Sequence, residues 1–188
     1  QFTTFKISGP KAREIMSKVF AEIDFSNENF PFMTFKIFNY MNTEVRIMRA
    51  SFTGEMGYEI YINPKFSLAL WEKIFDAIDD WICIIELDAT ILRSNKSVEK
   101  YFQFEKKDSV GLKCCKILHG IDSPIDDCPL TRMLKTKERE SAAEKNKEDR
   151  WLGVTIDPIF NGDGDLVGAV HMSRNINQSI WTPNNENL

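Results

Sequence analysis

The first 20 residues alternate apolar and polar positions in a pattern that predicts a strand followed by a helix. Phe5 and Ile7 alternate with Thr4 and Lys6, as on a half-buried strand. The Ser8-Gly9-Pro10 stretch offers a helix cap and a proline suited to the first turn. Helical spacing then follows at Ala12, Ile15, Met16 and Val19.

Three further strands and a second helix are predicted between residues 32 and 78. Two strands flank a turn at residues 41–43, and Tyr58, Ile60 and Ile62 alternate on a third strand. Asn63-Pro64 then combines an N-cap with a proline, which indicates the start of a helix that ends near Ile78. Residues 1–78 are therefore expected to form a ferredoxin-like-type β-α-β-β-β-α segment of the α+β class.

The pattern changes after residue 78 and predicts a second domain over residues 79–177. Two strands surround an acidic turn at Asp88-Ala89, and three short helices follow. A weak strand over residues 141–147 precedes two strong strands, joined by the hairpin signal Asn-Gly-Asp-Gly-Asp. Residues 178–188 form a polar tail that we expect to derive from cloning rather than from the fold.

Composition and charge narrow the classes of partner. The chain of 188 residues has a net charge of −4 and a pI of about 5.3, which disfavours nucleic acid and anionic membranes as partners. Its apolar runs are too short to span a bilayer. Four cysteines are few for a disulfide-stapled fold, and residues 1–20 lack a secretion signal. We therefore expect a cytoplasmic protein.

Residues 5–77 resemble the glycine cleavage T-protein family, which includes the folate-binding ends of sarcosine and dimethylglycine dehydrogenases. The resemblance rests on ISGPKAREIM, FPFMTFK, VRIMRASFTGEMGYEIYI and LALWEKIFDA. It implies that Glu55, with Tyr58 beside it, binds the pterin ring of tetrahydrofolate. A carboxylate can accept two hydrogen bonds from the donor pair of a pterin, and neighbouring glycines let the backbone approach a flat ring.

The same resemblance also sets a limit on activity. In the family, the catalytic aspartate lies upstream of the matching part, and arginines of the folate site lie downstream. We therefore expect no catalysis from this segment. For Glu55 the competing interpretation is a purely structural one, in which the side chain braces a turn inherited with the fold.

Residues 80–177 resemble the PAS sensory-domain family. The resemblance rests on IIELDATILRSNKSVEKYFQF, KKDSVGLKC and DPIFNGDGDLVGAVHMSRNI. It implies a five-stranded antiparallel sheet cupped by short helices, which holds haem, flavin, a small metabolite or nothing, and which can mediate a homodimer. Two departures stand out, because Ala89 and Gln103 occupy positions where the family usually has glycine. We expect apolar residues to line the cup: Ile84, Phe102, Leu118, Leu134, Val154 and Val170.

A cysteine and histidine cluster lies within the PAS-like part. Cys115 and His119 are four residues apart and share a helix face, with Cys114 and Cys128 nearby. Thiolates with an imidazole suit zinc or iron, so these four residues are candidate metal ligands. The alternatives are buried apolar cysteines beside a helix-capping histidine, or a redox pair. His171 is interpreted as a sheet residue rather than a haem ligand.

Two unrelated family segments joined without a linker predict a chimera, natural or engineered. The main hypothesis is a non-catalytic protein whose PAS module senses a ligand in signal transduction or associates with another protein. One alternative is a folate-dependent aminomethyltransferase-like fragment that uses Glu55. Another is an engineered recombination of folds that binds no ligand.

Overall fold

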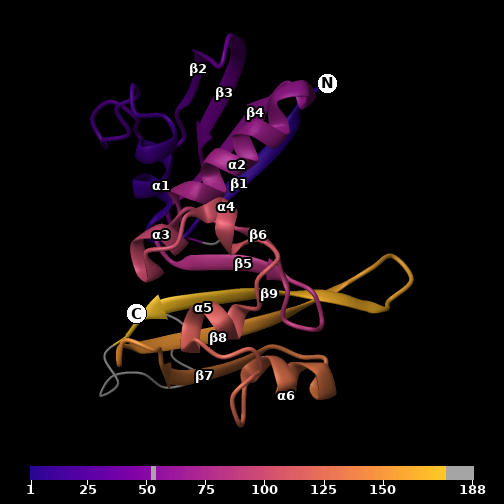
Figure 1. Ribbon diagram of the computed structural model, residues 1–188. Helices are drawn as coiled ribbons and strands as arrows, with labels where there is room; N and C mark the ends of the chain where they lie inside the picture. Colours follow the sequence, from indigo (N-terminus) through magenta and orange to yellow (C-terminus); the bar gives the residue numbers. More distant parts are fainter. Residues whose placement is uncertain (52–53, 177–188) are drawn as a thin grey trace. The chain divides into compact units, whose positions relative to one another are not determined.

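The computed structural model describes residues 1–51 and 54–176, and its chain divides into two compact units. The first unit spans Gln1–Ile78, and the second begins at Asp79 (Figure 1). Each unit contains one antiparallel sheet with helices, so the expected α+β class is confirmed. The tail at residues 178–188 lies outside the described residues.

The first unit follows the predicted element order. Its four-stranded sheet has the strand order β1-β4-β3-β2, and all three strand pairings are antiparallel. A short 3₁₀ turn precedes the second helix, where the sequence predicted one continuous helix. The elements are β1 (Thr3–Ser8), α1 (Ala12–Val19), β2 (Phe35–Tyr40), β3 (Thr43–Arg49), β4 (Gly57–Ile62), η1 (Pro64–Phe66) and α2 (Ser67–Ala77).

The core of the first unit explains why these strands alternate. Val45 and Ile47 of β3 lie beside Ile62 and Ile60 of β4, and all four side chains are fully buried. Two phenylalanines from the segment between α1 and β2 complete this core, since Phe25 and Phe30 stack with ring centroids 5.3 Å apart. Burial of large apolar and aromatic side chains is therefore the main stabilising contribution.

A hairpin turn and a helix cap, both predicted from the sequence, are present at the ends of these strands. Met41 and Asn42 have φ values of 55° and 58°, which is the conformation of a two-residue type I′ hairpin turn. The side chain of Asn63 accepts a hydrogen bond of 3.0 Å from the backbone N–H of Lys65. The sequence therefore specifies both where the hairpin turns and where the following helix begins.

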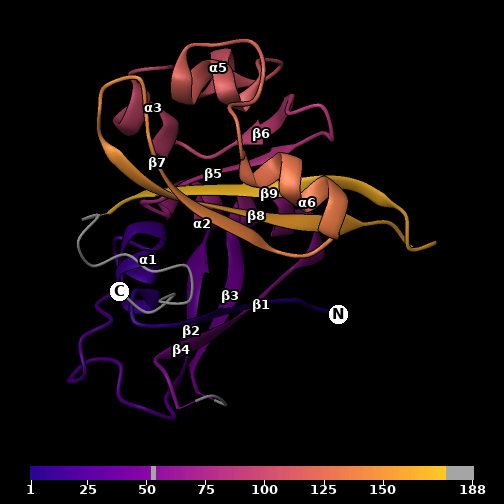
Figure 2. The ribbon, with the colours of Figure 1, turned by 90° about the horizontal axis from the view of Figure 1, so that it is seen from below.

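The second unit has a five-stranded antiparallel sheet in the order β6-β5-β9-β8-β7. The two longest strands form a hairpin, drawn from orange to yellow in Figure 2, and its turn is the predicted Asn-Gly-Asp-Gly-Asp sequence. The strands are β5 (Trp81–Ile85), β6 (Ile91–Ser94), β7 (Glu140–Lys145), β8 (Trp151–Phe160) and β9 (Leu166–Asn175).

Four short helices lie between β6 and β7, where the sequence predicted three. The extra element is a single helical turn where the sequence predicts only a turn, because four residues are too few to show helical periodicity. Helix α3 packs against β5, and α6 packs against β7 and β8. The helices are α3 (Ser97–Phe102), α4 (Lys106–Ser109), α5 (Cys114–His119) and α6 (Pro129–Thr136).

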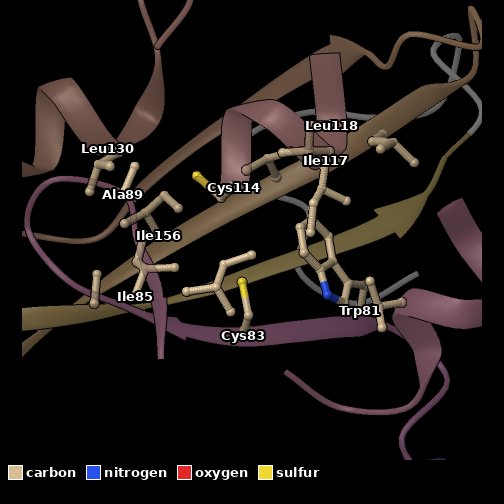
Figure 3. Packing of buried hydrophobic residues seen from close by; sticks show 14 of the residues in the cluster. Trp81, Cys83, Ile85, Ala89, Cys114, Ile117, Leu118, Leu130 and Ile156 are labelled. Carbon is tan, nitrogen blue, oxygen red and sulfur yellow. The ribbon is translucent and has the colours of Figure 1, made fainter. Parts of the chain in front are cut away.

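Side chains from the helices and the sheet form one buried core in the second unit. Figure 3 shows Trp81 at one end of this core and Leu130 of α6 at the other, with Cys83 and Ile85 of β5 between them. Asn95 supports the same region, since its side chain accepts a bond of 3.0 Å from the N–H of Ile82 and donates one of 2.9 Å to Asp80. No helix in the described ranges has the length and apolarity needed to cross a membrane.

The two departures from the PAS pattern fall on left-handed backbone. Ala89 has a φ of 75° and Gln103 a φ of 56°, and Gln103 ends α3. A left-handed residue with a side chain costs roughly 1–2 kcal/mol, which glycine avoids.

Replacing Gln103 by glycine is therefore expected to raise the free energy of unfolding of the second unit by about 1 kcal/mol. Thermal or urea unfolding of the full chain measures the change. Lys135→Gly is the matched control, since Lys135 is exposed on the right-handed helix α6 and glycine should destabilise there by about the same amount. A Gln103→Gly protein no more stable than the parent would contradict this account of the strain.

Candidate functional site

A pocket of about 280 Å³, including space open to solvent, lies between the helices and the sheet of the second unit. Figure 3 shows part of its wall, where Cys114 and Leu118 of α5 and Leu130 of α6 lie near Ile156 of β8. Six of the twelve lining residues are apolar, and the other six carry a thiol, an imidazole or a carboxylate. The complete lining is Cys114, Cys115, Leu118, His119, Ile125, Cys128, Pro129, Leu130, Glu144, Val154, Ile156 and His171.

All three cysteines of the pocket are free thiols. Burial raises the pKa of Cys114 to about 12, and it also raises the pKa of Cys115 and of Cys128. At Cys128 the backbone N–H groups of Leu130 and Thr131 act in the opposite direction, because they stabilise the thiolate. The thiols are therefore protonated at neutral pH, which makes them poor nucleophiles.

A short contact between His119 and Glu144 joins helix α5 to strand β7 at the pocket wall. The Nε2 of His119 lies 3.0 Å from Oε2 of Glu144, and both side chains are nearly buried, with 12% and 9% of their surface exposed. The backbone supports the same junction, since the N–H of Lys147 donates to the carbonyl of Leu118 at 2.8 Å. The carboxylate of Glu144 is therefore held in place at the edge of the pocket.

His171 is the most deeply buried titratable group of the pocket lining, with 2% of its surface exposed. Desolvation lowers the pKa of its imidazole from 6.5 to about 4, with the charge of Glu144 acting in the opposite direction and that of His119 in the same direction. His171 is therefore neutral at pH 7. Its Nδ1 has no hydrogen-bond partner among the described residues, which is unusual for a buried polar atom.

The four predicted metal ligands share this pocket but do not form a coordination site. Cys114, Cys115, His119 and Cys128 all line it. Across residues 1–51 and 54–176, no group of three or more histidine, cysteine, aspartate or glutamate side chains is arranged to hold a metal ion. The metal hypothesis therefore gains no support from the geometry.

The predicted cup residues divide into two groups. Leu118 and Val154 line the pocket, and Phe102 is buried in the adjoining core, where its ring meets Trp81 edge-on with centroids 4.8 Å apart. Val170 and Ile84 pair across β9 and β5 but face the opposite side of the sheet, so the prediction was wrong for both. Leu134 is also wrongly predicted, because 37% of its surface is exposed.

Sequence reasoning missed Glu144 as a site residue and placed His171 in a strand without assigning it to the pocket. The buried positions of β9 are Gly168, Ala169, His171 and Ser173, and the last three alternate with the apolar side chains of Val170 and Met172. Alternation gives the period of a strand but not the face that is buried. Since both faces of β9 carry apolar residues, the sequence favoured the wrong one.

The candidate folate residues lie in the first unit. Glu55 is exposed, follows a left-handed glycine at Gly54 with a φ of 81°, and makes no hydrogen bond or ion pair to another described residue. Tyr58, by contrast, is fully buried and meets the ring of Phe25 edge-on at 5.4 Å. The structure therefore separates the two, since Glu55 faces solvent and Tyr58 belongs to the core.

Gly57, two residues after Glu55, is required by the close approach of two backbone segments. A Cβ added at Gly57 would lie 2.6 Å from the backbone oxygen of Ala50, closer than real Cβ atoms approach. Gly57 is also the first residue of β4, opposite Ser8 of β1. The glycine is therefore needed where two backbone segments pass close together, whether or not a ligand binds.

Two family models match the chain, each over more than half of its length. The model of the GCVT N-terminal domain matches residues 1–103, and that of the PAS fold matches residues 75–179. The chain belongs to both families. The two matches overlap, and the structure assigns the residues from Asp79 onward to the PAS sheet, because β5 pairs with β9. We call Gln1–Ile78 the GCVT segment and the remainder the PAS unit.

Curated relatives resemble the chain mainly through the GCVT segment. The sarcosine oxidase subunit alpha of Corynebacterium sp. (strain P-1) is 37% identical over 78 residues, which is 41% of this chain and 8% of that protein. The aminomethyltransferase of Chlorobium phaeovibrioides is 35% identical over 174 residues, which is 90% of this chain and 47% of that protein. The chain thus spans less than half the length of either relative.

Solved structures resemble the chain mainly through the PAS unit. The PAS domain of a protein from Colwellia psychrerythraea has a TM-score of 0.46 and 22% identity, and the match covers 58% of this chain and 96% of that one. An RNA-binding Light-Oxygen-Voltage receptor has a TM-score of 0.51 and 11% identity, covering 71% of this chain and 38% of the receptor. At such low identity the likeness concerns the fold alone.

Proposed function

We propose that the chain is a non-catalytic sensor, in which the PAS unit binds a small molecule in the pocket between α5, α6 and the sheet. The observation that supports this most is the unpartnered Nδ1 of His171, a residue that lines the pocket. A buried polar atom without a hydrogen bond costs on the order of 1–3 kcal/mol, and a bound molecule that pairs with it would recover that energy.

The dimensions of the pocket narrow the class of ligand. Away from its open side, it has room for about one water molecule. Haem and flavin would require α5 or α6 to move away from the sheet, against the contact between Glu144 and His119. A neutral molecule of a few atoms that hydrogen-bonds to an imidazole fits the lining better, because His171 is uncharged at pH 7.

A thermal-shift screen of small neutral metabolites tests the proposal. A ligand present at about 100 times its Kd adds about 2.7 kcal/mol to the stability of the protein that binds it. We expect at least one compound to stabilise the parent chain but not His171→Leu, which lacks the hydrogen-bonding atom. A screen without such a compound, or an absorption band of haem or flavin in the purified protein, would count against this function.

The alternative is folate binding by the GCVT segment. Its support is the exposed carboxylate of Glu55 together with the likeness to an aminomethyltransferase. Titration of tetrahydrofolate against the parent chain and Glu55→Ala tests this, with Glu28→Ala as the control for another exposed glutamate. Binding that is absent, or equal in all three proteins, would end the alternative.

A further inference from the structure

Exposed apolar side chains are concentrated at one edge of the GCVT sheet. Strand β2 is the edge strand, and no described strand pairs with its outer side. Four large apolar residues lie within six positions there with half or more of their surface exposed. They are Phe32 at 59%, Met33 at 61%, Phe35 at 50% and Ile37 at 54%. An exposed apolar edge strand is a template for pairing with another strand.

The hairpin turn determines which backbone groups of β2 are free. In a two-residue hairpin the closing pair, Tyr40 and Thr43, exchanges both backbone hydrogen bonds, and the bonded pairs then alternate along the ladder. The N–H and C=O groups of Phe35, Ile37 and Asn39 therefore point away from β3. These three residues make no other backbone hydrogen bond within the described part of the chain.

We propose that the β2 edge is the interface of a two-fold symmetric dimer, in which β2 pairs antiparallel with β2 of a second copy and Ile37 lies on the axis. A two-fold axis perpendicular to the sheet keeps the buried faces of both copies on the same side. The backbone N–H and C=O groups of β2 that point away from β3 then face the same groups of the second copy. In this register Ile37 pairs with Ile37, and Phe35 pairs with Asn39 in both directions. Every free backbone group of the three residues then has a partner.

Charge favours the register centred on Ile37 over the adjacent register centred on Lys36. Lys36 is the only charged residue of β2, and a register centred on it would place two lysines face to face. Centred on Ile37, the register separates the two lysines, because each Lys36 lies opposite Phe38 of the other copy. The β2 edge is therefore self-complementary in this register, which favours a second copy of the chain as the partner.

Sedimentation of the full chain at sub-millimolar concentrations tests the dimer. Ile37→Lys brings two ammonium groups together on the axis, so self-association should weaken at least about tenfold. Val167→Lys is the matched control, since Val167 is 48% exposed on another strand, and it should leave the dimer unchanged. Ile37→Pro is a second variant that removes an N–H pointing away from β3, and it should weaken association with the hairpin intact.

Cross-linking tests the register itself. Two hydrogen-bonded residues across antiparallel strands have Cα atoms about 5.5 Å apart, within the range of a disulfide. Ile37→Cys should therefore form an intermolecular disulfide under mild oxidation. Phe35→Cys and the parent chain should not, because two copies of residue 35 would lie about 13 Å apart. A monomer at all concentrations, or a dimer unaffected by Ile37→Lys and not trapped by Ile37→Cys, would overturn the proposal.

Discussion

Replacing Trp81 by alanine should lower the free energy of unfolding of the PAS unit by about 4 kcal/mol. Trp81 is fully buried, and its ring meets Phe102 edge-on at 4.8 Å. Its Nε1 also donates a hydrogen bond of 2.9 Å to the buried hydroxyl of Ser94. The substitution therefore removes a large apolar surface, leaves a cavity at the end of the core shown in Figure 3, and removes the hydrogen bond that the buried Ser94 hydroxyl accepts.

Differential scanning calorimetry of the full chain measures this effect. A loss of about 4 kcal/mol corresponds to a fall in Tm of roughly 20 °C for a domain of this size. Trp151→Ala is the control, because Trp151 is only half-buried and lies under Lys145 at the sheet surface. Equal shifts for the two variants would mean that Trp81 does not anchor the core as its burial indicates.

Acidification should destabilise the PAS unit between pH 6.5 and pH 4 through His171. Burial lowers the pKa of this group from 6.5 to about 4 in the folded state, so in this window the unfolded chain binds a proton and the folded chain does not. Stability therefore falls as the pH falls. The difference between the two pKa values corresponds to about 3 kcal/mol at most.

A single variant separates the contribution of His171 to the free energy of unfolding from general acid denaturation. His171→Leu removes this titrating group, so its free energy of unfolding should fall less than that of the parent between pH 6.5 and pH 4. His119→Gln should keep the pH dependence, because His171 stays buried. The hydrogen-bonded carboxylates Asp88, Glu59 and Glu140 also have lowered pKa values, so their stabilisation is lost as the pH falls from about 5 downward, equally in the parent and in His171→Leu. Parallel pH profiles for the parent and His171→Leu would exclude this role for His171.

Local sequence signals predicted the fold class because each acts over a few residues. Alternating apolar residues indicated β4 and the β8–β9 hairpin, and Asn63-Pro64 indicated the start of the helical segment that follows β4. Two positive-φ positions in the PAS unit were also apparent, since Ala89 and Gln103 stand where the family prefers glycine. Helix α4 was not predicted, because one turn carries too little periodic signal.

The pocket depended on long-range pairing that no local pattern contains. Glu144 comes from β7 and His119 from α5, and only the docking of these elements brings them within 3.0 Å. The inward position of His171 follows from the pairing of β9 with β5 and β8, which places it beside the buried residues Cys83 and Ile156. The choice between two apolar faces of a strand is a property of the assembled sheet.

The stretch around Glu55 shows the same division between sequence and tertiary structure. The sequence by itself determined a turn between two strands, since glycines flank Glu55 and alternation resumes at Tyr58. Only the tertiary structure decided that Tyr58 packs in the core while Glu55 remains at the surface, and that Gly57 leaves room for the backbone of Ala50. Propensity and periodicity act between neighbours in the chain, whereas burial is decided by segments that meet only after folding.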